Sequence, residues 1–274
     1  MQVKQFIIPY TSRSEKIKIY PLGDIHAGTV HCAEEEFRSK VREVKDNPLA
    51  YWLGMGDYSD YITPKDPRWE PSLLAIPEWV EQDNIAECQR KRIVQLLSPI
   101  KGKCIGLLYG NHEESIRRHN HANVHKNICD DLGVDNLGYS CFIHFIFKRK
   151  GLLGQRHESW LLKGYFTHGT GGARTEGAKL NYLVRVMQSF EADIYGYAHV
   201  HSMQTHSPDF LGSTDQSLMI KAKPKAGALT GCWFRTYTQG VIASYGEMKV
   251  YSPSKIGCPV FVIEPNKREA KVEG

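Results

Sequence analysis

The alternation of apolar and polar residues predicts strands and helices in turn over the first part of the chain. Residues 16–20 alternate lysines with apolar side chains, which is typical of a half-buried strand. Over 34–46, three apolar residues share one helical face, and three glutamates occupy the first turn, where the helix dipole favours negative charge. An apolar run over 49–53 predicts a second strand. These elements make a βαβ unit, and ligands of open α/β sheets collect at the carboxyl ends of such strands.

Similar patterns continue along the chain. A Pro-rich, aromatic stretch without clear periodicity over 58–77 predicts a loop. Further helices are predicted over 78–97, 120–132 and 174–190, and further strands over 104–109, 139–148, 159–167 and 193–197.

The last quarter of the chain carries mainly β signals. We expect a β-rich part over 202–264 and a charged, frayed tail over 265–274. There are no repeats, low-complexity tracts or linkers, so a single domain over 1–274 with an α/β (α+β) fold is the simplest expectation.

Composition adds few constraints. The net charge of +5, from 35 basic and 30 acidic residues, is compatible with an anionic substrate. Seven cysteines without a Cys-x-x-Cys pair predict reduced, structural thiols rather than disulfides or a zinc cluster. No apolar run approaches the length of about 20 residues that a membrane span needs, and the first residues do not resemble a signal peptide. We therefore expect a cytoplasmic protein with no membrane partner.

Polar side chains follow the ends of five predicted strands. They are Asp24 and His26, then Asp57, the segment Gly110-Asn111-His112-Glu113, His168, and finally His199 and His201. Strand ends on one side of a sheet converge in space, so we expect these side chains to meet. Oxygen and imidazole donors without thiolate suit Mn, Fe or Zn, and a carboxylate between two ions suits a two-metal site.

These motifs, in this order, resemble those of the calcineurin-like metallophosphoesterases. The chain contains Gly-Asp-x-His, Gly-Asp, Gly-Asn-His-Glu, an isolated His-Gly and His-x-His between residues 23 and 201. The resemblance implies a two-sheet β-sandwich flanked by helices, in a four-layer αββα arrangement. It also implies two divalent metal ions, with Mn favoured and Fe or Zn as alternatives.

The resemblance further implies a role for each residue. One metal would be held by Asp24, His26 and His201, and the other by Asn111, His168 and His199, with Asp57 bridging both. His112 would lie near the leaving-group oxygen as a catalytic acid. Asp60 resembles the acid that orients this histidine and favours its charged form.

Several positions admit alternatives. His144 and His157 compete with His168 as ligands, and His121 and His125 could share a solvated helix face or hold metal. Arg117, Arg118 and Arg174 are candidate contacts for substrate phosphate, with a solvated surface as the alternative. Aromatic residues of the 58–77 loop could stack on bases or pack the loop down.

The expected activity is hydrolysis of a phosphate ester. The residue after Asp60 is Tyr61, where the phosphoprotein phosphatases carry arginine, so a phosphodiesterase or nuclease acting on DNA or a nucleotide ranks above a protein phosphatase. A phosphomonoesterase is the second candidate. A non-catalytic metal-binding scaffold is a third, which the presence of His112 disfavours.

Overall fold

The computed structural model describes residues 1–64, 66, 69, 75–150, 159–213 and 219–274. Within these ranges it forms a mixed α/β fold with two six-stranded sheets and a separate two-stranded hairpin. The strands of the first sheet, in spatial order, are β1 (Gln2–Tyr10), β6 (Ser140–Arg149), β7 (Ser159–Thr167), β8 (Ile194–Tyr197), β12 (Ala226–Thr230) and β9 (Met203–His206).

The second sheet contains the strands predicted at the start of the chain. Its strands, in spatial order, are β14 (Glu269–Glu273), β13 (Val260–Glu264), β2 (Ile17–Leu22), β3 (Ala50–Gly54), β4 (Cys104–Leu108) and β5 (Asn136–Gly138). Strands β2 to β5 are parallel, so their carboxyl ends lie at one edge of the sheet. The hairpin consists of β10 (Asp209–Ser213) and β11 (Ile220–Pro224).

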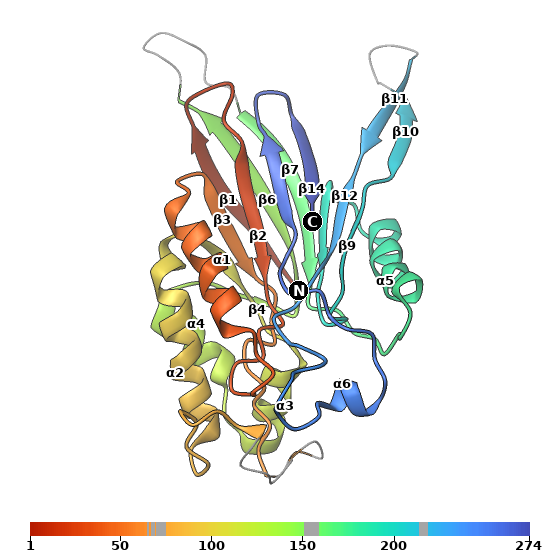
Figure 1. The fold of residues 1–274 in the computed structure, drawn as a ribbon. Helices are drawn as coiled ribbons and strands as arrows, with labels where there is room; N and C mark the ends of the chain where they lie inside the picture. The colour runs from red at the N-terminus through yellow and green to blue at the C-terminus, as the bar shows by residue number, and fades with distance from the viewer. Residues whose placement is uncertain (65, 67–68, 70–74, 151–158, 214–218) are drawn as a thin grey trace.

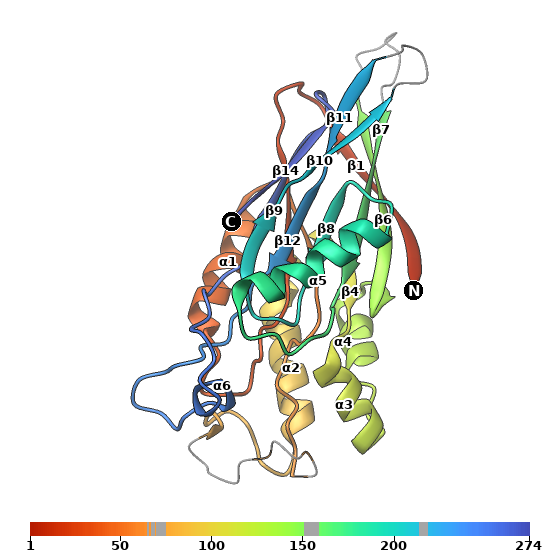
Figure 2. The same ribbon diagram turned by 90° about the vertical axis from the view of Figure 1, so that its right-hand side faces the viewer.

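Helices flank both sheets, as Figure 1 and Figure 2 show. The helices α1 (Glu34–Asp46), α2 (Ile85–Leu97) and α4 (Val124–Leu132) pack with residues of the second sheet in one buried cluster. Helix α5 (Glu176–Ser189) packs against the first sheet, and a further cluster draws its apolar side chains from both sheets. The other helices are the 3₁₀ helix η2 (Ser98–Lys103), α3 (Asn111–Asn120) and α6 (Tyr245–Met248). None of the helices in the described ranges has the length and apolar character needed to cross a bilayer.

The predicted elements agree with the structure at most positions, with two differences in the helices. The helix expected over 34–46 and the strand over 159–167 are confirmed. The helix expected over 78–97 begins only at Ile85, because Asn84 occupies the N-cap position and the residues before it form turns. The helix expected over 120–132 is confirmed as α4 but begins only at Val124. A separate helix, α3, precedes it from Asn111 and was not predicted; His121 in left-handed conformation (φ +53°) ends it. The 58–77 loop lacks helix or strand in its described residues, while 65, 67–68 and 70–74 lie outside them.

The two ends of the chain also differ from the predictions. The tail expected to be frayed over 265–274 instead forms β14, which pairs with β13. Its alternating sequence Glu-Ala-Lys-Val-Glu places Ala270 and Val272 against the core, so the pattern outweighs the high charge. The N-terminal strand β1 was not predicted, and it pairs in parallel with β6. The 202–264 part is β-rich as expected in its described residues.

His125 lies in the core rather than on a solvated helix face. Its side chain is 4% exposed and contacts the rings of Tyr58 and Tyr109, with centroids 6.3 and 5.6 Å away. Burial lowers the pKa of His125 to about 4, although the side chain of Asn136 and the backbone of Leu107 oppose the shift. His125 is therefore uncharged in the folded protein at neutral pH.

This burial predicts acid destabilisation. Between pH 6.5 and about 4 the unfolded chain binds more protons at this position than the folded one, so stability is full at neutral pH and falls as the pH drops. Urea titrations at about pH 7.5 and about pH 4.5 should show that His125→Phe removes about 2.5 kcal/mol of the pH-dependent loss. The same pH-dependent loss in both proteins would contradict this assignment.

Candidate metal centre

The side chains expected at the site come from loops that follow five strands. Asp24 and His26 follow β2, Asp57 follows β3, and Asn111 opens α3 directly after β4, all in the second sheet. The first sheet contributes His168 after β7, and His199 and His201 after β8. These strands end on the side of the molecule where α3 lies, below the strands in Figure 1. The site therefore joins loops of both sheets.

A first group consists of Asp24, His26 and His201, whose potential ligand atoms all lie within 4.8 Å of one another. His26 Nε2 and His201 Nε2 are 3.0 Å apart, and His201 Nε2 is 3.5 Å from Asp24 Oδ1. Asp24 is fully buried, and its Oδ1 has no hydrogen-bond partner among the described residues. A buried carboxylate oxygen without a donor is costly unless a cation or proton meets it, which suits a metal ligand.

A second group consists of Asp57, His168 and His199, again with ligand atoms within 4.8 Å of one another. Asn111 joins it, since its Oδ1 is 2.7 Å from His199 Nδ1 and 3.2 Å from His168 Nε2. His168 Nδ1 donates to the Met55 carbonyl at 2.8 Å, which turns Nε2 toward Asp57 Oδ2, 3.3 Å away. A hydrogen bond of this kind fixes the ring orientation of a metal-binding histidine.

Burial and charge oppose each other at this second group. Burial raises the pKa of Asp57, but the charges of His168, His112 and His26 outweigh it and hold that pKa well below its usual value. Burial lowers the pKa of His168, yet the adjoining Asp57 carboxylate raises it to about 9. The group thus holds a buried carboxylate that stays ionised at neutral pH.

His112 lies beside both groups, and a third group contains it with His26 and Asp60. Its Nδ1 donates to the Asp60 carbonyl oxygen, while its Nε2 is 4.0 Å from Asp57 Oδ2. The Asp60 carboxylate is 3.7 Å from His112 Nδ1 and closer, at 3.2 Å, to His26 Nδ1. Asp60 was expected to orient His112 as an acid; in the structure its carbonyl oxygen accepts the hydrogen bond from Nδ1, and its carboxylate lies farther away.

The ligand loops adopt unusual backbone conformations. Five residues of the first two groups have positive φ angles: Asp24 (+47°), His26 (+52°), Asp57 (+50°), His199 (+71°) and His201 (+48°). Each such residue costs about 1 kcal/mol or more and persists only where its surroundings enforce it. Strained backbone collects at functional sites, so this concentration independently marks the site.

Glu113 belongs to none of the three groups and instead binds the backbone of the loops that carry them. Its carboxylate accepts hydrogen bonds from the backbone N–H groups of Asp57, Tyr58 and Gly110 at 2.8–2.9 Å. Burial, followed by the charge of Asp57, raises the pKa of Glu113 to about 7. A Cβ at Gly110 would collide with the Asp57 carboxylate, which requires glycine there. The sequence placed Glu113 among the polar residues of the central segment but did not indicate this inward hydrogen bonding.

The three arginines that the sequence offered as substrate contacts lie in different surroundings. Arg117 and Arg118 both pair with Glu114, at 2.7 and 2.6 Å. Of the two, Arg118 lines a cavity of about 520 Å³ that also contains Asn111. Arg174 lies over the ring of Tyr251, 5.5 Å from its centroid. Of the rival ligands, His144 lies on β6 and belongs to none of the groups above, and His157 lies outside the described residues.

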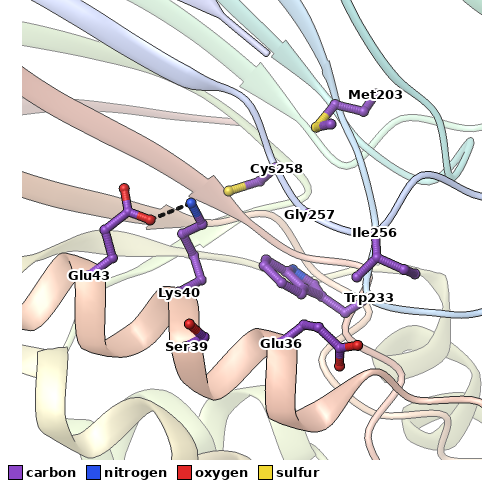
Figure 3. Close-up of a pocket in the computed structure, with 9 residues that line it drawn as sticks. All are labelled: Glu36, Ser39, Lys40, Glu43, Met203, Trp233, Ile256, Gly257 and Cys258. Carbon is purple, nitrogen blue, oxygen red and sulfur yellow. Dashed lines mark hydrogen bonds and ion pairs between the residues drawn. The ribbon is translucent and has the colours of Figure 1, made fainter.

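A second cavity, of about 370 Å³, lies between α1 and residues 256–258 (Figure 3). Its lining includes Trp233 and an ion pair between Lys40 and Glu43 with a nitrogen–oxygen distance of 2.5 Å. None of its lining residues belongs to the three groups. The cavity is therefore separate from the candidate metal centre.

The geometry brings all seven expected ligands together, and buried His and Asp groups of this kind could hold metal ions. Comparisons with models of known protein families and with curated proteins find no match for this chain.

Proposed function

We propose that the chain is a metal-dependent phosphoesterase with two divalent ions, and that its two sheets form the central layers of a four-layer αββα arrangement. The observation that supports this most is the adjoining set of buried carboxylate and imidazole groups, in which Asp24 Oδ1 accepts no hydrogen bond from the described residues although His201 Nε2 lies 3.5 Å away. Nitrogen and oxygen donors without thiolate suit Mn, with Fe or Zn as alternatives.

One ion would be held by Asp24, His26 and His201, and the other by Asn111, His168 and His199. Asp57 would bridge them, because its Oδ2 faces His168 while the charge of His26 also lowers its pKa. When bound, two such ions lower the pKa of a water molecule and neutralise charge on the phosphate oxygens.

His112 would supply the proton that the departing alkoxide needs. Since the Asp60 carbonyl accepts from Nδ1, the atom left to donate to substrate is Nε2, on the side of Asp57. The Asp60 carboxylate also lies 3.7 Å from this His112 Nδ1 nitrogen, so both oxygen-bearing groups of Asp60 face the Nδ1 side of the ring. Asp60 therefore acts as a positioning residue.

Phosphodiesters are the favoured substrates. At the position where protein phosphatases would place a guanidinium, Tyr61 is 2% exposed and its N–H bonds the Gln89 side chain at 2.7 Å. A phosphate monoester carries more negative charge than a diester. Because this buried tyrosine contributes no positive charge, no additional cation at this position balances that charge. A phosphomonoesterase is the alternative, and DNA or a nucleotide is the proposed substrate class.

The test compares two chromogenic esters. The purified full chain should hydrolyse bis-p-nitrophenyl phosphate faster than p-nitrophenyl phosphate with Mn²⁺ added, lose both activities with chelator, and regain them with Mn²⁺. Elemental analysis of the same samples reports bound metal. No turnover of either ester by a metal-loaded sample would overturn the proposal in favour of a binding scaffold.

A further inference from the structure

We propose that the cavity beside Asn111 receives an aromatic ring of the substrate, so that the chain acts on esters that carry a nucleobase. This inference rests on the proposed function and specifies its substrate class. The cavity measures about 520 Å³, within the range of small-molecule sites, and its lining includes Tyr109, Tyr139, Ser115 and Arg118.

Continuity with the metal centre places the cavity within reach of the same substrate. Asn111 lines the cavity and is also within 2.7 Å of His199 and 3.2 Å of His168. The Tyr139 ring lies 5.5 Å from the ring of His168. An ester whose phosphate lies at the second group therefore directs one of its organic groups into this cavity.

The aromatic walls of the cavity are held in place by their own contacts. The rings of Tyr109 and Tyr139 lie 5.4 Å apart at 62°. The Tyr139 hydroxyl donates to the Gly169 carbonyl at 2.5 Å, and the Tyr109 N–H donates to the Gly138 carbonyl at 3.0 Å. Because these rings are already ordered, a planar base gains stacking energy without the cost of immobilising them.

Polar groups complete the lining on the side of α3. Ser115 Oγ lies 3.2 Å from His119 Nδ1, and Arg118 pairs with Glu114 while its side chain remains 69% exposed. These hydroxyl, imidazole, guanidinium and carboxylate groups can meet the donors and acceptors on the edge of a base. An apolar lipid chain would cover these polar groups without adding any hydrogen bond to them, so the lining favours a nucleobase.

The experiment uses two esters with the same leaving group: thymidine 5′-(p-nitrophenyl phosphate) and methyl p-nitrophenyl phosphate. With Mn²⁺ present, the full chain should show a KM about 10-fold lower for the thymidine ester. Tyr109→Leu and Arg118→Met should each raise that KM several-fold without changing kcat, and should leave the KM of the methyl ester as it was. Lys126→Met is the control, because Lys126 is an exposed side chain that pairs with Asp130 and does not line the cavity.

A binding measurement separates this inference from the proposed function. Thymidine 5′-monophosphate titrated into the full chain with chelator present should bind and quench tyrosine fluorescence, and Tyr109→Leu should weaken that binding. Binding that depends on Tyr109 in a chain that hydrolyses no ester would support the cavity and refute the phosphoesterase. Equal KM values for both esters, unchanged in both variants, would refute the cavity and leave the phosphoesterase standing.

Discussion

His112→Ala should reduce turnover of an alkyl phosphodiester by a factor of about 10²–10⁴, the contribution expected of a general acid. The metal content should remain that of the unaltered chain, because His112 adjoins the ligand groups without belonging to the two proposed metal sites. Its Nδ1 is committed to the Asp60 carbonyl, so that Nε2 is the atom lost from the reaction. Steady-state kinetics combined with elemental analysis measures both quantities.

The identity of the leaving group distinguishes proton donation from a structural effect. A p-nitrophenolate leaves readily without a proton, so His112→Ala should slow p-nitrophenyl esters far less than alkyl esters. His121→Asn serves as the control, since His121 is exposed at the end of α3 and asparagine tolerates its left-handed conformation. Equal losses for both ester types would remove His112 from the role of acid.

Glu113→Ala should lower the free energy of unfolding by about 3 kcal/mol or more. The substitution leaves three buried N–H groups, those of Asp57, Tyr58 and Gly110, without an acceptor, and each costs about 1–3 kcal/mol. Metal affinity should fall as well, because the loops that present Asp57 and Asn111 are tied together through this carboxylate. Urea unfolding and Mn²⁺ titration calorimetry measure the two effects.

A milder substitution keeps this prediction testable if the alanine variant does not fold. Glu113→Gln retains one acceptor oxygen, so its loss of stability should be intermediate. Glu114→Gln is the matched control at the next position, where the ion pairs with Arg117 and Arg118 lie at the surface and contribute about 1 kcal/mol or less. A Glu113→Gln variant as stable as Glu114→Gln would show that the three hydrogen bonds are dispensable.

The sequence pattern predicted that the ligand residues meet, but it did not predict the backbone conformations that they adopt. The residues Asp24, Asp57 and His168 each follow a strand, and the regularity of parallel strand ends is sufficient to predict that they meet. The left-handed conformations of Asp24 and Asp57 depend on hydrogen bonds between the two loops, such as Asp24 N–H to the Gly56 carbonyl, which no local pattern encodes.

The remaining differences arise from tertiary contacts. The start of α3 at Asn111 was not predicted, because its first residues are polar: Asn111 and His112 lie at the site and Glu113 binds backbone N–H groups, so the apolar spacing of an amphipathic helix is missing there. Likewise β14 is stabilised by pairing with β13 and by the contacts of Ala270 and Val272, whereas its charged composition suggested disorder. The cavity beside Asn111 combines α3 with Tyr139, which only the folded chain brings together.

The division of the ligand loops between two sheets has a consequence for how the protein matures. Asp24 and Asp57 follow strands of one sheet, whereas His168 and His199 follow strands of the other. Neither sheet alone therefore provides all the potential ligands of either group. A nascent chain released before residue 201 is made would present only part of each ion's coordination sphere. Metal binding would then stabilise only molecules in which the two sheets have packed together. The number of ions bound per chain would therefore measure the correctly folded fraction of a preparation.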